Sequence, residues 1–162
     1  MSEVASPSDS PGSDSAVLRL EHNGRLIALL VRASFNRPGI QFFTSSEFSQ
    51  QLAHMAHPAG KTIDPHVHNP IAREVMYTQE VLLIKRGRIR VDLYSDEHAY
   101  LESWVAAAGD LILLASGGHG FQVLDDLEMI EVKQGPYAGD GDKTRLQSVA
   151  TEAVRITENF DA

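Results

Sequence analysis

Residues 80–94, EVLLIKRGRIRVDLY, decide the fold class. An apolar run leads into Gly87, and after the glycine apolar and polar residues alternate. A period of two is typical of a strand with one buried face, and a glycine between two such runs is typical of a tight turn. The stretch therefore predicts two strands, over 80–85 and 88–94.

Similar short runs lie on both sides of this stretch. Asn23 and Gly24 separate two apolar runs, and because both residue types tolerate the positive φ angles of a type I′ turn, a β-hairpin is expected there. Weak helical spacing over residues 146–156 indicates a short C-terminal helix. Further strands are expected at 51–55, 100–105, 111–115, 120–124 and 128–133. Short strands at this spacing indicate an all-β sandwich or barrel.

Composition narrows the function classes. A chain of 162 residues with 43% hydrophobic content and a net charge of −8 indicates one compact soluble domain. The acidic balance argues against nucleic acid as a partner. No apolar run is long enough to cross a membrane, and no signal-peptide pattern opens the chain, so we expect a cytoplasmic protein without a membrane partner. Because cysteine is absent, imidazole and carboxylate groups must hold any metal.

Four residues predict a metal site. His66 and His68 are one residue apart, and in a strand both would point to one face and reach the same ion. Glu80 begins an apolar run, where an isolated carboxylate is costly without a partner. His119 follows a glycine pair that lets the backbone bend. Three imidazoles and one carboxylate suit one divalent ion, Fe, Mn, Ni, Co or Zn, with up to two positions open for water or substrate.

Other residues compete with these ligands. Glu74 is the rival of Glu80, but Glu80 has a glycine, Gly87, at the start of the next predicted turn, whereas the residue seven positions after Glu74 is Val81. We therefore prefer Glu80. The remaining histidines are interpreted as packing or surface residues: His22, His54, His57 and His98.

The ligand candidates carry a resemblance to the cupin superfamily. The first cupin motif is a glycine, five residues, H-x-H, a spacer, a glutamate, six residues and a glycine. It is matched by Gly60, His66, His68, Glu80 and Gly87. The spacer of 11 residues between His68 and Glu80 is longer than the three or four residues usual in cupins.

The second cupin motif is matched with two departures. It is matched by Gly109, Ala115, Gly117 and His119. Alanine replaces the usual proline, and one residue rather than two separates the last glycine from the histidine. The segments SGGHGF and EMIEVKQGPY are also similar to a group of small bacterial cupins without an assigned reaction.

The resemblance implies a fold and a division of the chain. The implied fold is a cupin-type double-stranded β-helix, or jelly-roll barrel, over residues 49–137, with an N-terminal β-hairpin extension over residues 17–48. Residues 138–162 form a C-terminal extension. Residues 1–16 are almost all small or polar, which predicts a disordered tail because little apolar surface is available for burial.

The resemblance leaves the reaction open. It implies a metal-dependent enzyme, an oxygenase, isomerase or lyase, that acts on a small oxygenated metabolite. One alternative is a non-catalytic module that binds a sugar or an organic acid. Another is a metal-free sugar-nucleotide isomerase that uses paired histidines as acid and base. Glu80 argues against the metal-free alternative, because that chemistry does not need a third ligand.

Two residues near the motifs are candidates for substrate contact. Tyr77 lies in the long spacer and can donate a hydrogen bond to a bound oxyanion. Gln122 lies three residues after His119, which places it on the opposite face of an ideal strand and weakens its candidacy.

Glu131 and Lys133 are a further candidate pair. They share one face of the strand predicted over 128–133, where they would form an acid/base pair if that face points inward. We favour an outward direction, because Ile130 and Val132 on the other face need burial.

A homodimer is also expected. Residues 26–31, LIALLV, are apolar on both faces of the predicted hairpin, which indicates that both faces are covered, as when an extension packs on a neighbouring sheet.

Overall fold

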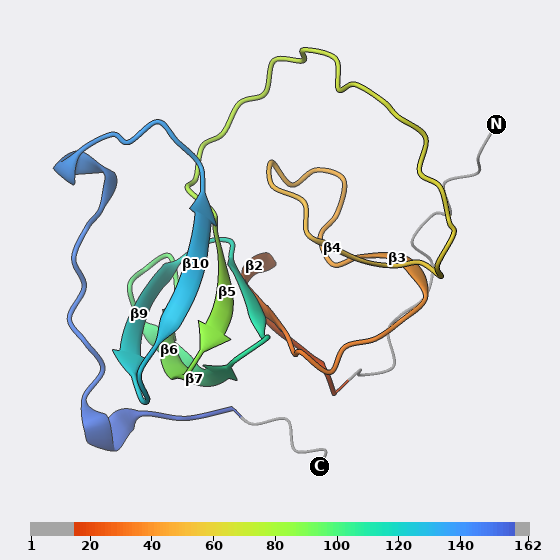
Figure 1. Ribbon diagram of the computed structural model, residues 1–162. Helices are drawn as coiled ribbons and strands as arrows, with labels where there is room; N and C mark the ends of the chain where they lie inside the picture. The colour runs from red at the N-terminus through yellow and green to blue at the C-terminus, as the bar shows by residue number, and fades with distance from the viewer. Residues whose placement is uncertain (1–14, 158–162) are drawn as a thin grey trace.

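Antiparallel β-sheets build this protein in the computed structural model, which describes residues 15–157 (Figure 1). Within that range the only helical pieces are two 3₁₀ turns, η1 (Asp140–Asp142) and η2 (Thr151–Ala153). The all-β prediction is confirmed. Most of the predicted tail, residues 1–14, lies outside the described residues. No helix between residues 15 and 157 has the length and apolar character needed to cross a membrane.

Two larger sheets and a separate ribbon contain all the strands of this range. The five-stranded sheet runs, in spatial order, β1 (Val17–His22), β2 (Arg25–Val31), β8 (Leu111–Leu114), β5 (Glu80–Arg86) and β10 (Glu128–Lys133). The three-stranded sheet runs β7 (Tyr100–Ala107), β6 (Arg88–Tyr94) and β9 (Gly118–Val123). The ribbon pairs β3 (Gly39–Phe42) with β4 (Ala53–Ala56). Each sheet is open, so β9 and β10 are edge strands in the described chain.

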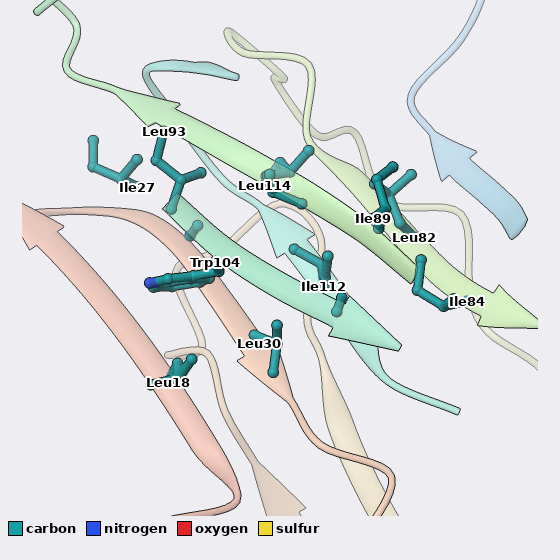
Figure 2. Packing of buried hydrophobic residues seen from close by; sticks show 13 residues of the cluster. Leu18, Ile27, Leu30, Leu82, Ile84, Ile89, Leu93, Trp104, Ile112 and Leu114 are labelled. Carbon is teal, nitrogen blue, oxygen red and sulfur yellow. The ribbon is translucent and has the colours of Figure 1, made fainter. Parts of the chain in front are cut away.

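The main core lies between the two larger sheets. Leu82 and Ile84 of β5 lie beside Ile89 of β6, and Ile112 of β8 lies between them and Trp104 of β7 (Figure 2). All five side chains are almost fully buried. Each contributes about 1.5–3 kcal/mol relative to an exposed side chain. This packing is that of a β-sandwich.

The predicted hairpin belongs to the larger sheet. Asn23 and Gly24 have φ angles of 50° and 74°, as a type I′ turn requires. β2 pairs with both β1 and β8, and residues 26–31 are all buried. Ile27 faces the main core, whereas Leu29 faces a second cluster with Phe35. The same chain thus covers both faces of the hairpin, which removes this reason for expecting a dimer.

Most predicted strands are found within about two residues of their expected bounds, as is usual for pattern-based boundaries. The ranges 88–94 and 128–133 match β6 and β10 at both ends. β3 was not expected from the sequence, because its four residues show no sustained alternation.

The predicted C-terminal helix is wrong. Ala150 and Val154 have extended backbone angles on either side of η2. Ile156 forms a parallel bridge with Ser103 of β7, and the Val149 backbone N–H donates a hydrogen bond to the Tyr94 hydroxyl. Contacts with the three-stranded sheet therefore decide the conformation, and they override a weak helical spacing.

Gly87 is required by the turn between β5 and β6. Its φ is 81°, and a β-carbon there would lie 2.2 Å from the Asp126 carbonyl oxygen. Gly24 also has a positive φ, but a β-carbon there would meet no atom within 4 Å. Two glycines with similar backbone angles therefore differ in the space around them.

We predict that Gly87→Ala lowers the free energy of unfolding by more than Gly24→Ala. Gly24→Ala costs about 1–2 kcal/mol for the left-handed backbone alone, and Gly87→Ala adds a clash with the backbone. Urea unfolding of both variants measures the difference. Equal losses would contradict the role assigned to the Asp126 carbonyl.

Candidate functional site

A buried carboxylate and an imidazole meet where the two larger sheets face each other. Glu80 is the first residue of β5, and His119 lies in β9 on the other sheet. His119 Nε2 is 3.2 Å from Glu80 Oε2, and Glu80 is only 5% exposed. The structure thus brings together two of the four predicted ligands, from positions far apart in the sequence.

Strand alternation explains why both side chains point inward. Glu80 alternates with Leu82 and Ile84, which belong to the main core. His119 pairs with Leu93, another core residue, and residues paired directly across two strands share a face. Glu80 and His119 therefore extend the two inner faces at one end of the sandwich.

The surroundings of Glu80 favour its ionised form. The hydrogen bond from His119 is the largest influence and lowers the pKa of Glu80 below its usual value of 4.5, although burial acts in the opposite direction. The positive charges of Lys133 and Lys143 lower this pKa further. The site is therefore an ionised carboxylate that His119 and two lysines stabilise.

Glu131 and Lys133 point inward, contrary to the expectation from the sequence. Lys133 pairs with Glu80, and Glu131 pairs with Leu82, so both share the inner face of the larger sheet. They form an ion pair of 3.1 Å, and Glu131 raises the pKa of Lys133. The correction follows from the register of β10 on β5, which the pattern of one strand does not contain.

Gln122 lies away from this pair. It is paired with Arg90, on the face of β9 opposite to that of His119. Strand alternation therefore places Gln122 on the face expected from its spacing, away from the pair, and its contact with a substrate stays a prediction.

Tyr77 lies beside a pocket near the same end of the larger sheet. Its ring is 4.7 Å from the Arg25 guanidinium carbon, a cation–π contact. Tyr77 and Lys133 also line a pocket of about 390 Å³, together with Tyr137 and Asp142. Lys133 therefore lies near Glu80 and also lines a pocket that is large enough for a small metabolite.

His66 and His68 lie in a segment without a strand, residues 57–79, which is exposed from residue 57 to residue 78. Figure 1 shows this segment as a wide arc from β4 to β5. The two rings are 5.2 Å apart, and His66 Nδ1 lies 2.9 Å from the Asp64 carbonyl oxygen, which can accept its hydrogen. The rival Glu74 is exposed in the same segment.

The predicted four-ligand cluster is thus only half assembled. Between residues 15 and 157, no group of three or more His, Cys, Asp or Glu side chains is placed to hold a metal ion. The expectation that His66 and His68 lie on a strand is wrong. Residues 57–79 pair with no strand of the described chain.

Of the other histidines, His54 packs edge-on against Phe35, with 5.0 Å between the ring centroids. Its interpretation as a packing residue is confirmed.

A second buried polar group was missed by the sequence interpretation. Asp92 accepts hydrogen bonds from Arg90 at 2.8 and 2.9 Å and from the Ser103 hydroxyl at 2.5 Å. The Tyr100 hydroxyl lies 2.8 Å from that of Ser103 and accepts from the Arg155 backbone N–H. The polar face of residues 88–94, which includes Arg90 and Asp92, was the sequence pattern that could have indicated this network. Because the network holds the C-terminal segment, its role is structural.

Comparison with known proteins adds no relative. No family model matches the chain, and no curated protein or solved structure matches it. The cupin resemblance therefore depends on the motif residues alone.

We predict that the stabilising effect of the Glu80 carboxylate depends on pH. Because the folded-state pKa of Glu80 is lowered, its ionised form stabilises the fold above the unfolded-state pKa, and this contribution is lost as the pH falls through the folded-state value. In the presence of a chelator, Glu80→Gln should reduce the unfolding free energy by about 1–2 kcal/mol at neutral pH and progressively less below pH 4.5.

Glu74→Gln is the matched control, because Glu74 is an exposed glutamate. Urea unfolding at a series of pH values compares the two variants with the wild type. A difference for Glu80→Gln that stays constant from neutral to acid pH would contradict the assignment.

Proposed function

We propose that the protein binds one divalent metal ion at the end of the sandwich where Glu80 meets His119. The observation that carries the proposal is their contact across the two sheets, with the carboxylate buried and ionised. A buried carboxylate needs a cationic or hydrogen-bonding partner, and carboxylate with imidazole is a common ligand set for Fe, Mn, Ni, Co and Zn. The residues present therefore fit such an ion.

His66 and His68 complete the ligand set in this proposal. Their segment ends at Gln79, whose backbone N–H donates to the Gln134 side chain at 2.5 Å, immediately before Glu80. The 11 residues between His68 and Glu80 can extend over roughly 36 Å. The segment is thus anchored beside the site and is long enough to fold back over it.

The free edge of β9 is the place where the histidines would bind. In the described chain β9 hydrogen-bonds to β6 on one side only. Phe121 and Val123 pair with core residues of β6, yet both are exposed. A strand containing His66 and His68, added along this edge, would satisfy the backbone of β9 and cover these side chains. That addition is how we propose that the open sandwich becomes a cupin-type jelly roll.

The chemistry proposed for the site is that of a metal-dependent enzyme, an oxygenase, isomerase or lyase, with a small oxygenated metabolite as substrate. A bound ion would polarise a substrate oxygen or activate water. Lys133 faces the same side as Glu80 and lines the neighbouring pocket, so it is placed to attract an anionic substrate group. Tyr77 lines the same pocket and can donate a hydrogen bond.

One observation favours a metal-free alternative. A histidine that donates to a buried carboxylate is held in a fixed tautomer, as in many general bases. His119 and Glu80 have this arrangement, so they can also serve isomerase chemistry in which histidines act as acid and base. A module that binds a sugar or organic acid without turnover would retain metal binding and lack activity.

We predict that alanine substitution of Glu80, His119 or His66 weakens Co(II) binding by at least about tenfold, because each removes a ligand. Binding is measured by calorimetry on protein purified without added metal. His57→Ala and Glu74→Ala are the controls, since they remove the same side-chain types from the exposed segment. Wild-type protein without Co(II) affinity would overturn the metal proposal, and equal losses in ligand and control variants would overturn the ligand assignment.

We also predict that the metal orders the histidine segment. Adding Zn(II) should slow hydrogen exchange over residues 64–70, because these amides would pair with β9, and His119→Ala should abolish the effect. Residues 88–94, already within a sheet, are the internal reference. Metal binding without protection of residues 64–70 would contradict the closure.

A further inference from the structure

The outer face of the larger sheet carries an apolar patch without cover in the described chain. Ile130 pairs with Leu83, so both side chains lie on the face opposite to the core, and Val132 lies beside them. The three are between 38% and 56% exposed. We call Leu83, Ile130 and Val132 the outer patch. Because Glu131 and Lys133 take the inner face of β10, Ile130 and Val132 must lie on its outer face.

The neighbouring part of this outer face is covered. Leu29 and Leu113 are fully buried there, in the second hydrophobic cluster. Their cover consists of Phe35, Phe43, Phe48 and Leu52. This cover stops before β10, so the outer patch is its uncovered continuation.

The β3–β4 ribbon carries a matching apolar face. Ile40 pairs with Met55, and Phe42 lies two residues from Ile40, so the three side chains share one face. They are between 49% and 59% exposed. The other face carries His54, which packs on Phe35. We call Ile40, Phe42 and Met55 the ribbon face. A two-stranded ribbon has little stability of its own, so this face needs a surface to pack on.

We propose that the ribbon face of one copy packs on the outer patch of a second copy, in a twofold-symmetric dimer. The ribbon continues directly from the segment that forms the cover, and Figure 1 shows it running away from β5 and β10 of its own chain. Every copy carries both surfaces, so a twofold axis lets each ribbon cover the partner's patch. This dimer does not depend on the proposed metal site.

The exposed apolar area and the charges around it are consistent with a second copy of the chain as the partner of the outer patch. Large apolar side chains at these exposures each offer on the order of 100 Å², so six from each copy bring roughly 1,200 Å² in total, the lower limit for a specific interface. The six side chains are uncharged, and the ion pair between Lys85 and Glu128 borders the patch near the end of β5. An apolar centre beside a charged border is typical of interfaces.

Sedimentation velocity of the full chain tests the dimer. The wild type should sediment as a dimer, and Ile130→Glu and Met55→Lys should each weaken dimerisation by at least about a hundredfold, because a charge would be buried in an apolar contact. Ile156→Glu is the control, since Ile156 has a similar exposure but lies in the C-terminal segment. It should leave the dimer intact.

A mixture of the two variants gives a second measurement. Ile130→Glu and Met55→Lys should form a mixed dimer, because one of its two contacts is wild type and the other brings opposite charges together. A monomeric wild type, or dimers unaffected by either variant, would overturn the proposal. Circular dichroism establishes that each variant is folded, and because Met55 lies outside both core clusters, its variant remains informative if Ile130→Glu unfolds.

Discussion

Burial of the two inner faces against each other is the constraint on which the rest of the structure depends. Strand alternation directs Leu82 and Ile84 from one sheet, and Leu93 from the other, into a common core. The same alternation, continued to the end of each strand, brings Glu80 and His119 together. The polar pair is thus positioned by apolar packing, which holds an ionised carboxylate where water has little access.

The sequence was sufficient to predict local structure where the residues of a single strand or turn determine it. Asn23 and Gly24 specify a turn by their backbone preferences alone, and residues 88–94 show a buried face by alternation. The sequence failed where the answer depends on a second strand. Alternation in β10 shows that Glu131 and Lys133 share a face, but only pairing of Lys133 with Glu80 shows that this face points inward.

The four predicted ligands of the candidate site also differ in how far the sequence alone could place them. Glu80 and His119 could be predicted because each lies on a strand that the pattern of apolar residues and glycines indicates. His66 and His68 could be assigned to one face only on the premise that residues 57–79 contain a strand, and a strand needs a partner as well as a pattern. The exposed edge of β9 and this segment both lack a partner in the described chain, and each can supply what the other needs.

In the proposed metal site, the contact between His119 and Glu80 would link metal binding to the loss of a proton. His119 Nε2 is the atom that donates to Glu80, so binding of a metal ion to this nitrogen would require displacement of its proton. The ion would then take the place of the His119 N–H as the partner of Glu80, which would keep the buried carboxylate compensated. Lys133 lies on the same sheet face as Glu80, because the backbone pairing of β10 with β5 fixes that face. In the proposed exchange of a proton for a metal ion, the carboxylate would therefore keep a lysine on the same sheet face.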